Sequence, residues 1–154
     1  MIYVYAALPV ENVQAALECI RKSCPGALSV IVRRGFGCNK LLYYSLFLSL
    51  KSFQIAANKA RSPELEWLCR LACVSNVESA LKATAPVAGE GVAIASTKAF
   101  PDALKKELGI TGEVSCKGCD RKFLSSYYCL SKESLKAFPL CGLATEKMAI
   151  EAAR

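Results

Sequence analysis

Residues 51–85 combine helical periodicity with explicit helix-start signals, and they predict three consecutive helices. In the first, over residues 51–61, apolar side chains recur at i, i+3, i+4 and i+7, the spacing of one buried helical face. These side chains are Phe53, Ala56, Ala57 and Ala60. The opposite face then carries a polar strip, joined by Lys59, that is either a binding surface or an ordinary solvent-exposed face. The strip comprises Lys51, Gln54, Asn58 and Arg61.

The second and third helices of this stretch are predicted from their first residues. Ser62-Pro63 places a hydroxyl N-cap before a proline at the first helical position. Within that second helix, Glu66 and Arg70 are spaced as an i, i+4 ion pair. Residues 75–78, Ser-Asn-Val-Glu, have the pattern of a capping box and predict the start of the third helix at Ser75.

The remaining chain alternates predicted strands with predicted helices. Short β-rich or apolar runs predict strands over residues 2–8, 27–33, 91–96 and 111–115. The continuously apolar run 27–33 is expected to be a central strand, and 111–115 an edge strand. Residues 41–50 are ambiguous, and their aromatic and serine content favours a strand at the start, with a helix from about Leu48.

Further helices are predicted over residues 10–23, 101–108, 120–128, 131–138 and 143–153. Ser131 is the expected N-cap of the helix over residues 131–138. Residues 139–142 are expected to end that helix and to separate it from the last one. Strands interleaved with helices indicate an α/β (α+β) layer fold. We therefore expect a single domain over residues 1–154, with a mixed β-sheet of about four strands flanked by about six to eight helices.

Charge is distributed unevenly along the chain. Lys and Arg outnumber Asp and Glu by 20 to 13, a net charge of +7. Residues 1–62 hold eight basic side chains against two acidic ones, a local net charge of +6. This balance favours an acidic partner, RNA or an acidic protein surface, facing the N-terminal half. Arg33-Arg34-Gly35-Phe36-Gly37 is either a nucleic-acid-binding loop or a solvated turn.

Targeting and membrane signals are missing from the sequence. Residues 1–5 resemble a strand and have no basic region typical of a signal peptide. The longest apolar run, residues 41–50, is shorter than the roughly 20 residues that a membrane-spanning helix needs. We expect a soluble cytoplasmic protein.

Nine cysteines and no histidine restrict the chemistry of the chain. Serine–histidine and cysteine–histidine catalytic pairs are excluded, as are mixed Cys/His zinc sites. Cys116-Lys117-Gly118-Cys119 has the spacing of half a zinc knuckle or of a redox pair, and Cys129 and Cys141 are candidates to complete a four-thiolate site. Structural disulfides, as in some hyperthermophile proteins, and buried thiols are the favoured alternatives, so no metal or cofactor is assigned.

Motifs for catalysis are also missing. The sequence contains no phosphate-binding or dinucleotide-binding glycine loop. No paired carboxylates lie in apolar surroundings, and Glu66 has Arg70 as a plain structural partner. The sequence therefore favours a binding protein over an enzyme.

Three segments resemble the signature of a known family. Residues 52–60 (Ser-Phe-Gln-Ile-Ala-Ala-Asn-Lys-Ala), residues 64–68 (Glu-Leu-Glu-Trp-Leu) and residues 74–81 (Val-Ser-Asn-Val-Glu-Ser-Ala-Leu) occur in the family's order. A hydrophobic strand follows, here residues 91–96, and residues 127–135 and 146–150 are similar to the family's ending. The chain thus resembles the smallest core subunit of the KEOPS complex, the Cgi-type or TPRKB (PRPK-binding protein) family, over roughly residues 41–154.

This resemblance implies a non-catalytic subunit. Such a subunit binds the small Bud-type kinase/ATPase of KEOPS, supports its activity, and helps recruit tRNA by its 3′ end for threonylcarbamoylation of the adenosine next to the anticodon. The expected tRNA-binding residues are Lys51, Lys59, Arg61, Arg33 and Arg34. The expected partner-binding residues are Met148, Ile150, Lys147, Gln54 and Asn58. The alternatives are a cysteine-based zinc or redox protein and a stand-alone RNA-binding module.

Overall fold

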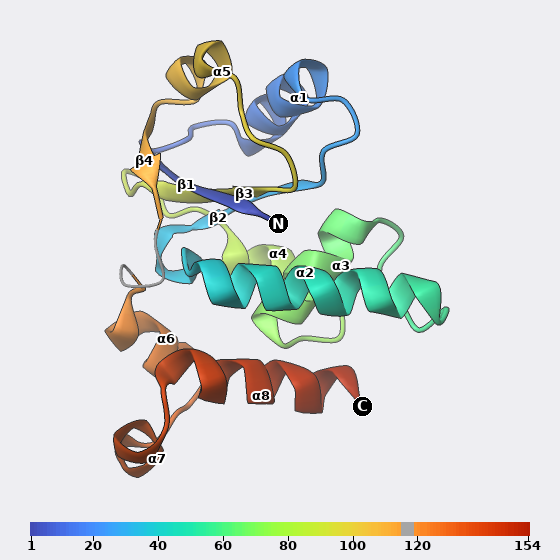
Figure 1. Cartoon of the computed structure of the whole chain (residues 1–154), viewed down its shortest axis with the longest axis vertical. Helices are drawn as coiled ribbons and strands as arrows, with labels where there is room; N and C mark the ends of the chain where they lie inside the picture. The colour runs from blue at the N-terminus through green and yellow to red at the C-terminus, as the bar shows by residue number, and fades with distance from the viewer. Residues whose placement is uncertain (115–118) are drawn as a thin grey trace.

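A four-stranded antiparallel sheet lies between two layers of helices in the computed structural model (Figure 1). The structure describes residues 1–114 and 119–154. The strands are β1 (Tyr3–Ala7), β2 (Ser29–Arg33), β3 (Val92–Ser96) and β4 (Ile110–Glu113). Their order across the sheet is β2-β3-β1-β4, and every pairing among the described residues is antiparallel.

Eight α-helices and one 3-10 turn surround this sheet within the described residues. On one face lie α1 (Val13–Ser23) and α5 (Asp102–Glu107) (Figure 1). On the other face lie η1 (Arg34–Phe36), α2 (Asn39–Gln54), α3 (Pro63–Ala72) and α4 (Val77–Thr84). The C-terminal helices α6 (Arg121–Tyr127), α7 (Lys132–Ala137) and α8 (Leu140–Ala152) lie beyond α2. The expected α/β architecture of about four strands and six to eight helices is confirmed, but the sheet, expected to be mixed, is antiparallel in its described pairings.

Alternating side chains of the strands fill two separate cores. Ile31, Tyr5 and Ile94 point toward α1 and α5, where they pack with Ile20 and Leu104. The intervening strand residues point to the opposite face and join a larger core that contains Phe36, Leu41, Trp67, Leu124 and Met148. Strand side chains alternate between the two faces of a sheet, and here each set packs in its own core. Both faces of this sheet are therefore covered by helices.

The position of β2 differs from the sequence prediction. Residues 27–33 were expected to form a central strand, but β2 is an edge strand that pairs only with β3 among the described residues. Four of its five residues are nevertheless buried, because helices cover both of its faces. A continuously apolar run predicts that both faces of a strand are covered by other elements. It does not predict whether the strand has neighbouring strands on both of its edges. The two central positions belong to β1 and to β3, all of whose residues are buried.

The predicted N-caps Ser62 and Ser131 are confirmed by side-chain hydrogen bonds. The Ser62 hydroxyl accepts a hydrogen bond from the Leu65 N–H at 3.3 Å, and Ser131 caps α7 in the same way. The third predicted helix begins one residue later than expected, because Asn76 rather than Ser75 accepts from the Ser79 N–H at 2.8 Å. The last helix, α8, begins at Leu140, so residues 140–142 continue the chain as helix where a break was expected.

Helix α2 is where the sequence prediction is wrong. Residues 41–47 were expected to be a strand, but the whole of Asn39–Gln54 is helical. Its inner face includes three buried serines, Ser45, Ser49 and Ser52. Their hydroxyls donate to the carbonyls of Leu42, Pro63 and Ser49, respectively. Because these hydrogen bonds satisfy the hydroxyls, a serine-rich face packs in the core, a pattern that hydrophobic periodicity does not detect.

The end of α2 is equally unexpected. The helix stops at Gln54, so the polar strip predicted on a helix over residues 51–61 does not form. The Ala57 N–H donates to the Ser52 carbonyl at 2.8 Å and the Ala56 N–H to the Phe53 carbonyl at 3.4 Å, the two bonds of a Schellman cap. Ala56 takes the left-handed conformation that this cap requires, with φ 54°. Glycine or asparagine usually marks that position, so an alanine there concealed the helix end.

No helix in the described part of the chain is both long enough and apolar enough to cross a membrane.

The alanine at this cap predicts a stabilising substitution. Ala56 is exposed and has positive φ, so Ala56→Gly removes the left-handed penalty without a loss of packing. We expect the free energy of unfolding in urea to rise by about 0.5–1 kcal/mol. The matched control Ala57→Gly, whose φ is not positive, should lower it by a similar amount. Equal effects of the two variants would contradict the role of Ala56 in the cap.

Candidate functional site

The loop over residues 55–61 is fixed by one buried carboxylate. Glu66 of α3 is 0% exposed, and its Oε2 accepts hydrogen bonds from the backbone N–H groups of Lys59 at 2.7 Å and Ala60 at 2.8 Å. Its Oε1 accepts from the Ser52 hydroxyl at 3.2 Å. The Glu66 carboxylate thus satisfies the N–H groups that the loop turns inward. The loop therefore has a defined conformation although it contains no helix or strand.

Arg70 completes this network. Its Nε lies 2.8 Å and its Nη2 2.6 Å from Glu66 Oε1, which confirms the predicted i, i+4 ion pair. Arg70 Nη2 also donates to the Ala57 carbonyl at 3.4 Å, at the start of the same loop. Both charged side chains are buried, and a buried ion pair persists only when its remaining hydrogen-bonding positions are filled. The pair therefore ties α2, the loop and α3 together.

The five predicted tRNA-binding cations fall into two groups. Lys51 is exposed in the last turn of α2, and Lys59 and Arg61 are exposed on the loop. Arg33 and Arg34 precede the first turn of α2, and this 16-residue helix is about 24 Å long. The structure brings the first three residues to one end of α2 and leaves the two arginines at the other.

The two arginines also differ from one another. Arg33 is half-buried, and its guanidinium lies 4.9 Å from the centre of the Phe123 ring, a cation–π contact with α6. Arg34 begins the 3-10 turn and is exposed. Arg33 thus has a structural contact that limits its freedom to bind a ligand, whereas Arg34 remains available at the surface.

An apolar stripe on α2 was missed by the sequence analysis. Tyr43, Phe47 and Leu50 repeat at i, i+4 and i+7, and are 51%, 49% and 39% exposed. Gln54 continues the same face one turn later and is also exposed. Helical spacing over residues 43–54 was the signal that could have revealed this stripe. The prediction of a strand that changes to a helix at about Leu48 hid it, because it divided these side chains between two elements.

The predicted partner-binding residues lie in different environments. Met148 is 1% exposed and packs in the larger core, so its prediction as a surface anchor is wrong. Leu140, Ala144 and Met148 recur every four residues and form the buried face of α8. Lys147 is exposed and Ile150 is 49% exposed.

Gln54 and Asn58 were predicted on one helical face, but only Gln54 is helical. The Asn58 side chain donates to the Ala60 carbonyl at 2.9 Å within the loop. Both residues are exposed.

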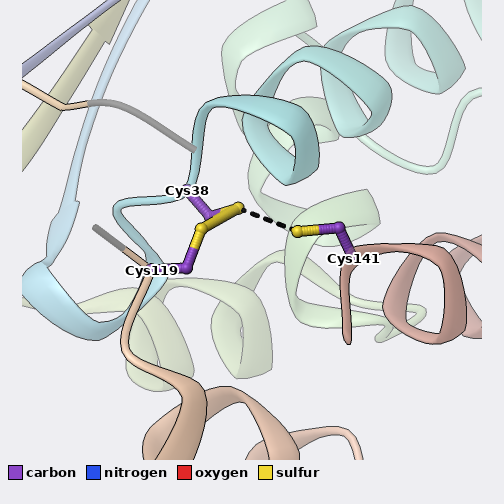
Figure 2. The surroundings of a disulfide bond; sticks show 3 residues. All are labelled: Cys38, Cys119 and Cys141. Atoms are coloured by element: carbon purple, nitrogen blue, oxygen red, sulfur yellow. Dashed lines mark hydrogen bonds between the residues drawn. A yellow bond between two sulfur atoms is a disulfide. The ribbon is translucent and has the colours of Figure 1, made fainter. Parts of the chain in front are cut away.

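Three cysteines meet at the other end of α2 (Figure 2). Cys38 and Cys119 are joined by a disulfide, with Cα atoms 5.0 Å apart, and Cys141 Sγ lies 3.5 Å from Cys38 Sγ. The expectation of a disulfide is thus met for this pair. Of the four cysteines considered as a zinc set, Cys116 lies outside the described residues, and Cys129 is exposed and is not among the three.

Two further cysteines are structural. Burial raises the pKa of the Cys73 thiol to about 11, assisted by the charge of Glu151. Burial also raises the pKa of the Cys69 thiol. Both thiols therefore stay protonated at neutral pH, which excludes them as ready nucleophiles.

Comparison with protein-family models and with curated proteins finds no match for this chain. Three features of the molecule are candidate functional sites: the loop fixed by Glu66, the stripe on α2, and the cysteines at the start of α2.

Removal of the Glu66 charge should destabilise the fold strongly. Glu66→Gln leaves the Arg70 guanidinium buried without a counter-charge and places an amide donor against either that guanidinium or the inward-facing N–H groups. We expect the free energy of unfolding in urea to fall by about 3 kcal/mol. Exposed Glu90 offers the matched control, and Glu90→Gln should change it by less than about 0.5 kcal/mol. A loss below about 1 kcal/mol for Glu66→Gln would show that the network is not essential.

Proposed function

We propose that this chain is a non-catalytic subunit of a KEOPS-type complex, which binds the small Bud-type kinase/ATPase and helps recruit tRNA for threonylcarbamoyladenosine modification. The observation that carries the proposal is the outer face of α2. There an exposed apolar stripe of Tyr43, Phe47 and Leu50 leads directly to the cations Lys51, Lys59 and Arg61. Apolar anchors suit a protein partner, and cations suit a phosphate backbone.

The stripe supports the kinase-binding part of the proposal. Aromatic side chains dominate protein–protein hot spots, and a helix with anchors at i, i+4 and i+7 is a common recognition element. The inner face of α2 is packed against α3, where Trp67 Nε1 donates to the Leu42 carbonyl at 2.9 Å and the Ser45 hydroxyl at 3.0 Å. Because this packing fixes the helix, its outer anchors are preorganised for a partner. Ile150 and Lys147 on α8 line a separate hollow with Leu130 and Ser134, so they are a second candidate contact apart from the stripe.

The basic loop supports the tRNA-binding part of the proposal. Lys59 and Arg61 lie on a backbone that Glu66 holds in place, while their own side chains remain exposed. Cations on a fixed backbone lose less freedom on binding than cations on a mobile loop. Lys and Arg contacts to phosphates provide affinity without reading sequence, as the recruitment of many tRNAs by a shared 3′ end requires.

Charge placed in the stripe should prevent kinase binding. Phe47→Glu introduces a carboxylate at the centre of the proposed interface, and we expect affinity for the Bud-type kinase to fall at least about 30-fold. The measurement is calorimetric titration of the purified kinase with this chain. Leu81→Glu on α4 is the matched control, since Leu81 is 47% exposed and Phe47 is 49% exposed. Equal affinity of the Phe47 variant and the wild type would place the kinase elsewhere.

Replacing the two loop cations with neutral residues should weaken tRNA binding and should also reduce its salt dependence. For Lys59→Gln combined with Arg61→Gln, we expect the slope of log affinity against log salt concentration to become shallower by about 1.4, at 0.7 per phosphate contact of a single strand. Lys22→Gln with Lys106→Gln, on α1 and α5 across the sheet, is the charge-matched control. An unchanged slope rules out the loop as the tRNA contact. Normal tRNA binding without any kinase binding would favour a stand-alone RNA-binding module.

A further inference from the structure

Three segments that are distant in sequence bring their cysteines to one point. Cys38 directly precedes α2, Cys119 precedes α6, and Cys141 lies in the first turn of α8. Cys38 is separated from Cys119 by 81 residues and from Cys141 by 103. All three sulfur atoms lie within 4.8 Å of one another. Across residues 1–114 and 119–154, no other group of metal-binding side chains is this close.

The disulfide joins two of these sulfurs, and the third lies against that pair. Cys141 Sγ points at the Cys38–Cys119 pair from the C-terminal helical layer (Figure 2). Thiolates bound to one tetrahedral zinc ion at about 2.3 Å have sulfur atoms about 3.8 Å apart. The separation of 3.5 Å between Cys38 Sγ and Cys141 Sγ and the limit of 4.8 Å for the group bracket that value. The three sulfurs can therefore share one ion after shifts of less than the length of a bond.

The two helices that supply Cys38 and Cys141 begin differently from most of the others. Within the described residues, α1, α3, α4, α6 and α7 each have a side chain that caps the first turn. The starts of α2 and α8 have no such side-chain cap. The positive ends of their dipoles lie at the residues that carry Cys38 and Cys141, and such a position favours negative charge.

We propose that Cys38, Cys119 and Cys141 form a zinc site in the reduced protein, and that the Cys38–Cys119 disulfide is its metal-free, oxidised form. Reduction by a dithiol breaks the S–S bond with two electrons and two protons, and the reductant leaves as a disulfide. Each thiol that then binds Zn²⁺ releases its proton to the solvent. The ligand at the fourth tetrahedral position is not assigned, and Cys116 lies outside the described residues.

This site has a structural role at the start of α2. Cys38 is fully buried, whereas Cys119 and Cys141 are partly buried, as suits a closed site at the rim of the core. The ion would tie α8 to the start of α2, and α8 and α2 also pack along their lengths (Figure 1). The inference is independent of the proposed function, since it involves neither the stripe nor the loop.

Metal analysis of the full chain tests the proposal. The protein is reduced with dithiothreitol without oxygen, mixed with ZnCl₂, freed of excess metal and analysed for zinc and by zinc X-ray absorption. We expect one zinc per chain with at least three sulfur ligands at about 2.3 Å. We also expect Cys141→Ser to weaken zinc binding at least 100-fold in competition with a chromophoric chelator, a larger loss than the 10–100-fold of a second-shell change.

The matched control is Cys129→Ser, which removes an exposed cysteine outside the group and should keep wild-type zinc affinity. If Cys141→Ser fails to fold, the sulfur count of the wild-type protein decides alone. Substoichiometric zinc in the reduced wild type, or fewer than three sulfur ligands, would overturn the proposal. So would mass-spectrometric detection of a Cys38–Cys141 disulfide in a chain that binds no zinc, because the group would then be a thiol–disulfide exchange site.

Discussion

The carboxylate of Glu66 is the group on which the arrangement of α2, the 55–61 loop and α3 depends. It accepts hydrogen bonds from the Ser52 hydroxyl, from two loop N–H groups and from Arg70, so that its partners come from α2, the loop and α3. A charge this deeply buried is tolerated only when donors surround it, and N–H groups turned inward need an acceptor. The two requirements are met together, which gives a loop without regular structure one defined conformation.

Further hydrogen bonds between α2 and α3 determine which side of α2 faces outward. Its hydrogen-bonded serines and Trp67 hold one face against α3, and the opposite face is therefore the one that carries Tyr43, Phe47 and Leu50. The loop fixed by Glu66 then places Lys59 and Arg61 beyond the end of this stripe. A core made partly of polar groups thus produces a surface in which apolar anchors and cations are neighbours.

Helix α2 also links the group of cysteines to the basic loop. Its first residues lie beside the cysteines that link the segment before α6 and the start of α8, and its last residues lead into the basic loop. α8 packs along it with Leu140, Ala144 and Met148 turned inward. Contacts at one end of α2 therefore bear on the position of α8, while contacts at the other end bear on the loop, and the exposed stripe lies between them.

The sequence by itself determined the features that local hydrogen bonds and side-chain alternation specify. These include the four strands, the caps at Ser62 and Ser131, and the Glu66–Arg70 pair, because each involves residues at most a few positions apart. Only the tertiary structure decided the helical state of residues 39–54, the edge position of β2, the burial of Met148 and the meeting of three cysteines. In each case the deciding partner is distant along the chain: Ser49 donates to the Pro63 carbonyl, and Cys141 meets Cys38 across 103 residues. Hydrophobic periodicity predicts which faces of a segment are buried. Which other elements cover those faces depends on long-range packing.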